Sequence, residues 1–301
     1  MGDHQLPQQG GRETSFGSKQ GSKEQPLISI ITSTFNAEKD LHWTIDSIRA
    51  QTYPNIQWIV ADGGSKDGTV DLLKQNEDVI DFWFSEADKG IYDAWNKALK
   101  HAKGEWIQFI GAGDELADEL VFEKVSKHLS TAFPTYELVY GSIDIISEEN
   151  RVFIERIGTP WEDMKDKWFG IRPALPMHPE VFHHRSIFED LDFTKFKIVG
   201  DSYIVLNSVL RKEPMYLDIL IDRMPLGGVS TNPKNIINMY LELKLINKRL
   251  SINPPFKNKA LEFFKVYVKY FIMRFIGKAA FNFLGDFYRR LLNKPSKWLV
   301  K

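Results

Sequence analysis

The chain has 301 residues, of which 43% are apolar, so it can bury a hydrophobic core as one elaborated domain with an appendage. It contains no cysteine, which excludes disulfides and thiolate metal sites and permits a reducing cytosol. Its net charge of −1 hides an asymmetry: residues 256–301 hold eleven Lys and Arg against two acids, a balance of +9. The rest of the chain is therefore acidic.

The first half of the chain alternates apolar runs with helical patterns. Residues 1–25 are rich in Gly, Ser, Gln and charge, which predicts a disordered tail without a secretory signal. The expected strands are 27–32, 56–61, 80–84 and 105–110. The expected helices are 37–50, 69–76, 91–102 and 116–128. This alternation predicts an α/β fold with a mostly parallel, Rossmann-like sheet flanked by helices.

The second half is less regular. Residues 137–146 and 151–157 predict a hairpin, and 158–180 predict an irregular segment rich in Trp and Pro. The remaining expected elements are a helix at 200–211, a strand at 215–221, and helices from about 235 and 259.

The basic end of the chain has a helical amphipathic pattern. Polar residues recur every four positions from Arg274 to Arg290, with aromatic and aliphatic residues opposite them. An upstream stripe through Lys265 and Lys269 points to a different face, which predicts two helices or a bend near Gly277. Charges interrupt every window of ~20 residues, so no membrane span is expected. The charge and the aromatics suit an anionic membrane surface better than nucleic acid.

The most informative stretch runs from Trp58 to Thr69, where an apolar run ends in Asp62 and a tight turn follows at Gly63–Gly64. Open α/β sheets bind ligands at the carboxyl ends of their strands. A carboxylate there can accept hydrogen bonds from a nucleobase imide or a ribose hydroxyl, or it can simply cap the glycine turn. The strand before it ends in a similar way at 33–36, so the two strand ends should frame one pocket.

Three segments in this order resemble a known family. They are Ser33-Thr34-Phe35-Asn36, the Asp-Gly-Gly-Ser-Lys-Asp-Gly-Thr of 62–69, and the Glu-Ala-Asp-Lys-Gly-Ile-Tyr-Asp-Ala-Trp-Asn of 86–96. Together they resemble the nucleotide-sugar half of family-2 glycosyltransferases, inverting enzymes with the GT-A fold, in their bacterial exopolysaccharide and O-antigen branch.

The resemblance covers residues 27 to about 231 and implies a domain organisation. A GT-A glycosyltransferase domain would span 26–231, divided into a nucleotide-sugar half (26–134) and an acceptor half (135–231). A helical, basic and amphipathic C-terminal region would follow at 232–301.

The resemblance also implies a donor site. The residues implied for its base pocket are Thr34, Phe35, Asn36 and Asp62. Asp88 and Lys89 would face the donor sugar and phosphates, although Lys89 can equally be a surface lysine. Tyr92 and Asn96 fall on one face of a helix at i, i+4, and the free N–H groups at its amino end would favour a diphosphate; Tyr92 can equally be core. Gly227–Thr231, including Ser230, resembles the loop that closes over the donor.

A metal site is implied after the strand at 105–110. Asp114 matches the acidic metal motif of the family, where it would contact a Mg²⁺ or Mn²⁺ that bridges the two phosphates. Gly113 stands where many relatives have a second Asp, so Asp114 would be the only protein carboxylate on the metal. The alternative is that Asp114 caps the helix expected to follow it.

The catalytic base is implied in the acceptor half. Residues 196–203 match the family segment in which an acid opens a helix facing the acceptor, which makes Asp201 the base. The alternative is that Asp201 is a helix N-cap. His178 lies in a stretch resembling the acceptor side, but a lone His before Pro is more often structural.

The implied activity is transfer of a sugar from a nucleotide-diphosphate sugar to a hydroxyl of a lipid-linked or growing bacterial surface glycan. UDP is the commonest donor nucleotide of the family. Two rivals stay open: a transferase onto polyprenyl phosphate, which needs no base, and an inactive sugar-nucleotide binding protein. A dinucleotide oxidoreductase is poorly supported, because Gly111-Ala-Gly113 lacks the third glycine. The expected location is cytoplasmic, on the inner face of the cell membrane, with no nucleic-acid partner.

Overall fold

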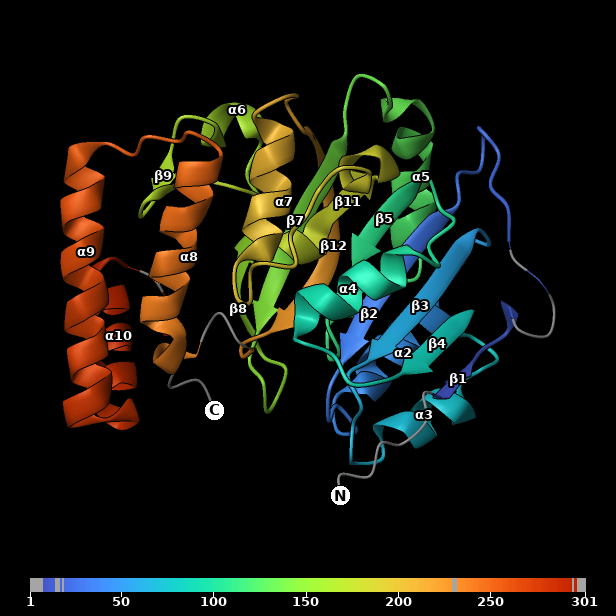
Figure 1. Ribbon diagram of the computed structural model, residues 1–301, viewed down its shortest axis with the longest axis horizontal. Helices are drawn as coiled ribbons and strands as arrows, with labels where there is room; N and C mark the ends of the chain where they lie inside the picture. The colour runs from blue at the N-terminus through green and yellow to red at the C-terminus, as the bar shows by residue number, and fades with distance from the viewer. Residues whose placement is uncertain (1–7, 14–16, 18, 229–231, 294, 297–301) are drawn as a thin grey trace.

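A computed structural model describes residues 8–13, 17, 19–228, 232–293 and 295–296. In this part of the chain the main sheet runs in the order β1-β4-β3-β2-β5-β11-β7-β12-β6, and β8 pairs with β7 (Figure 1). Its strands are β1 (Gln8–Gly10), β2 (Ile28–Thr34), β3 (Ile56–Asp62), β4 (Phe82–Ser85), β5 (Trp106–Phe109), β6 (Glu115–Leu116), β7 (Leu138–Ile146), β8 (Phe153–Ile157), β11 (Val181–His184) and β12 (Met215–Pro225). A separate two-stranded sheet pairs β9 (Trp168–Phe169) with β10 (Arg172–Pro173).

Helices cover both faces of the sheet. The α-helices are α2 (Leu41–Arg49), α3 (Thr69–Gln75), α4 (Ile91–Leu99), α5 (Val121–Ala132), α6 (Trp161–Met164), α7 (Gly200–Val209), α8 (Ile236–Arg249), α9 (Phe256–Phe271) and α10 (Lys278–Leu291). The short helical turns are η1 (His178–Glu180), η2 (Arg185–Phe188), η3 (Pro233–Asn235) and the π-helical η4 (Ile272–Ile276).

The parallel half of the sheet follows the sequence pattern. Strands β4, β3, β2 and β5 are parallel neighbours, and β2 and β3 are buried over almost their whole length. Strands buried on both faces carry continuous apolar runs, because a helix layer covers each face. The expected mostly parallel α/β sheet flanked by helices is confirmed.

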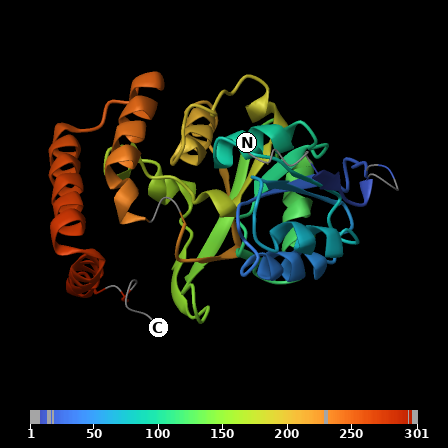
Figure 2. The same ribbon diagram turned by 60° about the horizontal axis from the view of Figure 1, so that its bottom comes forward.

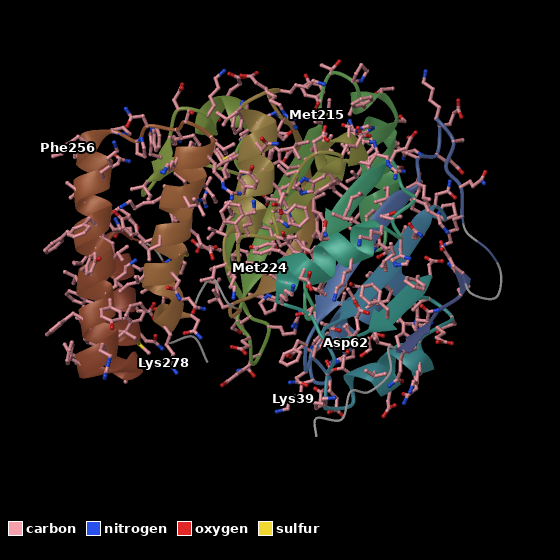
Figure 3. All side chains as sticks on the ribbon, viewed as in Figure 1. Lys39, Asp62, Met215, Met224, Phe256 and Lys278 are labelled. Atoms are coloured by element: carbon pink, nitrogen blue, oxygen red, sulfur yellow. The ribbon has the colours of Figure 1, made fainter. Side chains whose placement is uncertain are left out.

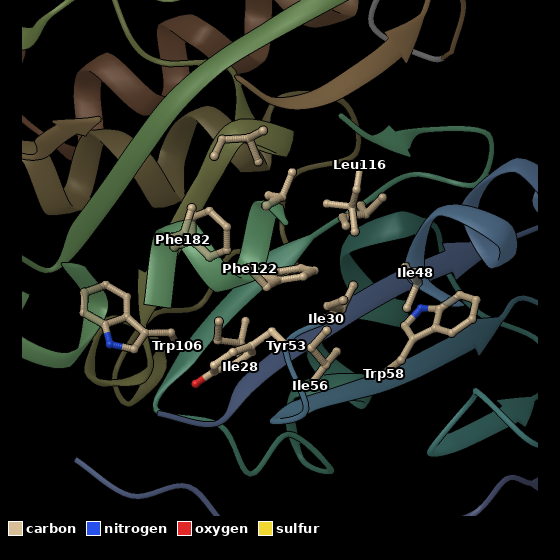
Figure 4. Close-up of a cluster of buried hydrophobic side chains, with 14 of the residues drawn as sticks. Ile28, Ile30, Ile48, Tyr53, Ile56, Trp58, Trp106, Leu116, Phe122 and Phe182 are labelled. Atoms are coloured by element: carbon tan, nitrogen blue, oxygen red, sulfur yellow. The ribbon is translucent and has the colours of Figure 1, made fainter. Parts of the chain in front are cut away.

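Two hydrophobic clusters lie on opposite faces of the sheet. The first packs α2, α3 and α5 against alternate residues of β2 and β3, such as Ile30 and Trp58 (Figure 4). The second packs α4 and α7 against the other face, through residues such as Ile31 and Trp95. Because β2 alternates between the two clusters, the sheet fixes the position of each strand end.

The hairpin at 137–157 is present as β7 and β8, and β12 extends the expected strand at 215–221 to Pro225. The helix expected at 116–128 begins instead at Val121, because Glu115–Leu116 pairs with β12 as strand β6. Strand β11 was not predicted; it lies antiparallel between β5 and β7 and joins the two halves of the sheet.

Within 1–25, the described residues 8–13, 17 and 19–25 differ from the expected disordered tail. Gln8–Gly10 forms strand β1 at the edge of the sheet, antiparallel to β4. Arg12 and Lys19 both pair with Asp81, which is buried at the start of β4. Because a buried carboxylate is costly without a partner, the pairing of Arg12 and Lys19 with Asp81 fixes these residues in place despite the polar composition around them.

The carboxyl-terminal helices stand as a group beside the sheet, on the side remote from β1 (Figures 1 and 2). The expected bend near Gly277 is confirmed: η4 ends α9, and Gly277 has a φ of 104°, which favours glycine. Val266 of α9 packs with Ile171 and Tyr240, so one face of α9 contacts the body of the protein.

Candidate active site

The carboxyl ends of the parallel strands β2, β3 and β4 lie side by side. Thr34 lies opposite Asp62, and Asp62 lies opposite Ser85. Thr34 Oγ1 donates to Asp62 Oδ1 at 2.9 Å, and Ser85 Oγ donates to Asp62 Oδ2 at 2.6 Å. The predicted strand-end acid therefore holds β2, β3 and β4 together (Figure 3 labels Asp62).

The Asp62 carboxylate also caps the glycine turn. Its Oδ2 accepts the N–H groups of Gly64 at 3.1 Å and Ser65 at 2.9 Å, and the Ser65 hydroxyl bonds to its Oδ1. Asp62 is 1% exposed, and the two N–H hydrogen bonds show that its carboxylate caps the turn. Contact with a nucleotide needs one of the three hydroxyl donors to turn toward the ligand.

The loops after β2, β3 and β4 converge around Gly63. A Cβ on Gly63 would lie 2.6 Å from Asp88 Oδ2 and 3.4 Å from the Phe35 ring. The Phe35 side chain is 66% exposed and is free to stack on a planar group. Asn36 ties the first two loops together, donating its N–H to Ser65 Oγ and accepting the N–H of Lys66. These loops bring together the residues implied for the donor site.

Helix α4 starts at this pocket and leads away from it. Asp88 Oδ1 accepts the N–H of Gly90, and the N–H of Lys89 donates to Asp93 in the first turn. Lys89 is exposed, and Asn96 is half-buried one turn after Tyr92.

Tyr92 connects the donor pocket to the predicted base. Its ring is buried in the core, and its hydroxyl donates to Asp201 Oδ1 at 3.2 Å. A Cβ on Gly200 would lie 2.9–3.0 Å from the Tyr92 ring, so glycine is required for α7 to approach α4 this closely. Tyr92 can therefore be a core residue through its ring and a site residue through its hydroxyl.

Asp201 lies in the first turn of α7, where Oδ1 also accepts the N–H of Ser202 at 2.7 Å. Burial raises the pKa of Asp201, and the Ser202 N–H, the Arg172 cation and the Tyr92 hydroxyl oppose this increase. Asp201 as a whole residue is half-buried. A carboxylate with a raised pKa is suited to accept a proton.

Replacing Tyr92 by Phe tests this connection through pH. Loss of the hydroxyl removes a hydrogen bond to the ionised carboxylate, so the pKa of Asp201 rises further. If the ionised carboxylate is the active form, the acid limb of the profile of kcat/KM against pH moves to higher pH. Tyr203→Phe, a change on the same helix as Asp201, should leave that limb in place.

The loop after β5 is held by α2. Thr44 Oγ1 of α2 donates to the carbonyl of Asp114 at 2.8 Å and accepts the N–H of Gly113 at 2.9 Å. Arg151, from the β7–β8 turn, donates to the carbonyl of Gly113 and pairs with Glu115. Gly113 has a φ of 99°, so an aspartate at this position would be strained.

Asp114 is not a helix cap. Leu120 precedes the first turn of α5, and Asp114 instead accepts the N–H of Gly111 through Oδ2 at 2.8 Å. Burial raises the pKa of Asp114 to about 6, and the Gly111 N–H and the Arg151 cation oppose this rise. Among the described residues no three histidine or acidic side chains converge as metal ligands, so a cation here would need phosphate oxygens to complete its shell.

His178, Glu180 and His183 form a buried polar cluster in the acceptor half. His178 stacks on Trp95, with ring centroids 4.9 Å apart, and lies 4.9 Å from the His183 ring. Burial lowers the pKa of His178 to about 3, so it is neutral near pH 7. Glu180 is fully buried and accepts only the N–H of Met177 among the described residues. Burial raises the pKa of Glu180 to about 9, so it too is neutral.

The Glu180→Gln variant should be more stable than the parent protein at neutral pH. A folded pKa of about 9 against 4.5 means that Glu180 favours folding most below pH 4.5 and loses this contribution as the pH rises toward 9. At pH 7 the loss is about 3 kcal/mol, at 1.36 kcal/mol per pKa unit. Urea unfolding at several pH values should show the two proteins converging near pH 4.5 and diverging above it.

The residues that the structure brings together come from both halves of the chain, and their roles in binding and catalysis stay predictions. Ser230 lies outside the described residues. Arg172 was missed because it lies in the irregular 158–180 segment, where no periodic pattern marks it. Its guanidinium lies over the Phe169 ring at 5.3 Å and close enough to Asp201 to lower the pKa of that carboxyl.

The loops at the carboxyl ends of parallel strands and the candidate base Asp201 are thus linked through Tyr92. The sequence profile described as glycosyl transferase family 2 matches residues 29–192. An uncharacterised glycosyltransferase of Mycobacterium tuberculosis is 30% identical over 212 residues, covering 69% of this chain and 78% of that protein. The chain belongs to glycosyl transferase family 2 and is a glycosyltransferase.

A second relative is named for a pathway. A PGL/p-HBAD biosynthesis glycosyltransferase of Mycobacterium bovis is 33% identical over 168 residues, covering 54% of this chain and 61% of that protein.

Solved structures show the same fold. TarS of S. aureus with UDP superposes with a TM-score of 0.55 at 15% identity, covering 88% of this chain and 77% of that one. The mannosyltransferase PcManGT from Pyrobaculum calidifontis, in complex with GDP-Man and Mn²⁺, superposes with a TM-score of 0.53 at 15% identity, covering 89% and 81%. The GT-A fold expected from the sequence is confirmed.

Proposed function

We propose that this protein is an inverting glycosyltransferase that moves a sugar from a nucleotide diphosphate to an acceptor hydroxyl, with Asp201 as the base. The Tyr92–Asp201 hydrogen bond carries the proposal, because Tyr92 belongs to the helix that starts at the donor pocket. Through this bond, a group bound at the amino end of α4 and an acceptor at Asp201 have a fixed relation to each other.

The donor half binds the nucleotide at the strand ends. Phe35 offers an exposed ring for the base, with Thr34 and Asn36 beside it. Asp62 would accept a hydrogen bond from an imide N–H or a hydroxyl once one of its hydroxyl partners turns away. Asp88 and Lys89 lie at the amino end of α4, where free N–H groups and a cation favour a diphosphate. Structural neighbours are described with UDP and with GDP-Man, and we propose UDP here because it is the family's commonest donor nucleotide.

The donor set near Asp114 fits a hard divalent cation. Asp114 is almost fully buried and supplies a carboxylate in the loop after β5, and Mg²⁺ or Mn²⁺ accepts carboxylate and phosphate oxygens. When bound, such a cation would neutralise charge on the leaving diphosphate. Thr44 and Arg151 hold the loop that presents Asp114.

The acceptor chemistry belongs to Asp201. Its carboxylate takes the proton of the acceptor hydroxyl while that oxygen attacks the anomeric carbon opposite the leaving nucleotide, and the configuration inverts in one displacement. Arg172 stabilises the ionised carboxylate before the reaction, and Tyr92 fixes its orientation.

A screen of nucleoside diphosphates by thermal shift, each with and without Mn²⁺, tests the donor assignment. A ligand that binds only the native state raises the melting temperature in proportion to RT ln(1 + [L]/Kd), so the true nucleotide should stand out. UDP should give the largest shift, and Phe35→Ser should reduce it without lowering the melting temperature of the free protein. Equal shifts for all nucleotides would contradict the base pocket, and no hydrolysis or transfer of any nucleotide sugar would favour an inactive binding protein.

We further propose that the acceptor is lipid-linked and that the C-terminal helices bind the anionic inner surface of the cell membrane. No helix in the described ranges is long and apolar enough to cross a bilayer. Helices α9 and α10 and the η4 segment between them nevertheless expose aromatic and aliphatic side chains beside basic ones, including Phe264, Phe271, Phe275, Phe283, Phe287 and Leu291. Exposed apolar surface mixed with cations is typical of proteins that bind an anionic bilayer at its interface.

A cavity between α8 and α9 supports an amphiphilic acceptor. It has a volume of about 610 Å³ and is lined by the aromatic rings of Tyr240, Phe256 and Phe263 and by the cations Lys244, Lys248 and Lys259. Ile171 also lines it, immediately before Arg172, which faces Asp201. In this proposal a lipid phosphate binds in the cavity and its sugar extends toward Asp201.

Cosedimentation with liposomes tests the membrane surface. Replacing Phe264, Phe271 and Phe275 by Ser should weaken binding to anionic vesicles at least tenfold, because burial of each ring in the interface contributes roughly 1.5–3 kcal/mol. The matched control is Phe153→Ser, an exposed aromatic on β8. If the triple variant and the parent bind anionic vesicles equally, α9 does not bind the membrane.

A further inference from the structure

The loop that presents Asp114 leaves a divalent cation short of protein oxygen ligands. Gly113 occupies the position of a second acid, and its positive φ of 99° disfavours an aspartate there. Glu115, the next acid along the chain, is already paired with Arg151. A second carboxylate would have to come from another element.

Strand β12 supplies an acid next to this loop. Asp222 lies opposite Leu116 in the antiparallel pairing of β12 with β6. Leu116 comes two residues after Asp114 in the chain, so Asp222 and Asp114 are diagonal neighbours. Diagonal neighbours across an antiparallel pair have side chains ~7–8 Å apart or less, on the same face of the sheet. Two carboxylates at this separation can both reach one ion between them.

The Asp222 side chain has no satisfied partner in the part of the chain that the structure describes. It is 0% exposed, and neither carboxylate oxygen receives a hydrogen bond of normal geometry there. The backbone N–H groups of Arg223 and Glu115 lie close to it, so the carboxylate lies beside the peptide that follows Asp114. A buried acid without a partner is costly, and retaining it is explained if a cation compensates it.

We propose that Asp222 is the second protein carboxylate of the divalent-cation site, acting with Asp114 in place of the acid missing at Gly113. This inference rests on the proposed metal-dependent transfer. One oxygen from each acid, together with phosphate oxygens and water, meets the preference of Mg²⁺ and Mn²⁺ for oxygen ligands.

The proposal differs from a structural role for Asp222 in a measurable way. If Asp222 only fills space, Asn can replace it without loss of folding stability, since Asn has the same shape and no charge to desolvate. If Asp222 is a metal ligand, the same change weakens metal binding, because a neutral amide is a weaker partner for a hard cation.

The experiment measures Mn²⁺ binding directly, from the electron paramagnetic resonance signal of free Mn²⁺, in the full chain with and without saturating UDP. Asp222→Asn should bind Mn²⁺ at least tenfold more weakly while its melting temperature without metal stays equal to or above that of the parent. The matched control is Asp218→Asn, an exposed acid on the same strand, which should bind Mn²⁺ as the parent does.

Comparison with Asp114→Asn separates this inference from the proposed function. If both variants lose Mn²⁺ affinity, and the double variant loses little more than Asp114→Asn alone, the two acids hold one ion. If Asp114→Asn loses affinity and Asp222→Asn does not, Asp222 is structural and the inference fails while the metal site stands. If neither loses affinity, the metal site itself is wrong.

Discussion

The Asp201→Asn variant should lose sugar transfer by about 10²–10⁴-fold, the usual contribution of a positioned general base, while nucleotide binding changes little. Asparagine retains an oxygen that can accept from Ser202 and Tyr92, so α7 keeps its contact with α4. It cannot take the proton of an acceptor hydroxyl. The measurement is kcat for transfer beside the Kd for the donor nucleotide.

The matched control is Asp190→Asn, an exposed acid in the segment that precedes α7, which should transfer at the rate of the parent. Loss of nucleotide binding together with activity would make Asp201 a structural residue of the first turn of α7. Unchanged transfer onto a phosphate acceptor would instead favour the polyprenyl-phosphate rival, because such an acceptor is already anionic and needs no base.

The fold was predictable where local pattern and tertiary environment agree. Strands β2 and β3 are continuous apolar runs because both of their faces are covered, and glycine or polar turns mark their ends. Strand β11 was missed because Val181–His184 is short and ends in two histidines. Its identity as a strand depends on pairing with β5 and β7, and sequence periodicity does not report pairing across the chain.

The start of the helix expected at 116–128 was wrong for a related reason. The helix was expected to begin at residue 116, yet pairing with β12 makes Leu116 a strand residue and α5 begins at Val121. The amino-terminal strand also depends on a distant partner, since Asp81 recruits Arg12 and Lys19.

Candidate site residues could be proposed where they belong to ordered motifs near strand ends. Asp62, Asp88 and Asp201 were proposed in this way, and their roles stay predictions. Arg172 and Asp222 were not proposed, because one lies in an irregular segment and the other reads as an ordinary residue of a strand. What singles out Asp222 is burial without a partner, which becomes visible only in three dimensions.

The Asp114→Asn variant should lose transfer by about 10²-fold or more, because an interaction worth several kcal/mol with the leaving diphosphate depends on the cation it holds. The amide oxygen can still accept the N–H of Gly111, and Thr44 still anchors the loop, so the fold should persist. Donor binding without metal should be unchanged, while the increase in donor affinity on addition of Mn²⁺ should disappear.

Isothermal titration of UDP with and without Mn²⁺ measures this directly in the parent and the variant. Asp118→Asn is the control, since this exposed acid follows the same loop and pairs with Lys124. A variant that still gains UDP affinity from Mn²⁺ would show that the cation binds elsewhere. Asp114 would then be retained for the hydrogen bond that closes its turn onto Gly111, and the charge on the leaving diphosphate would have to be stabilised by Lys89 and the amino end of α4.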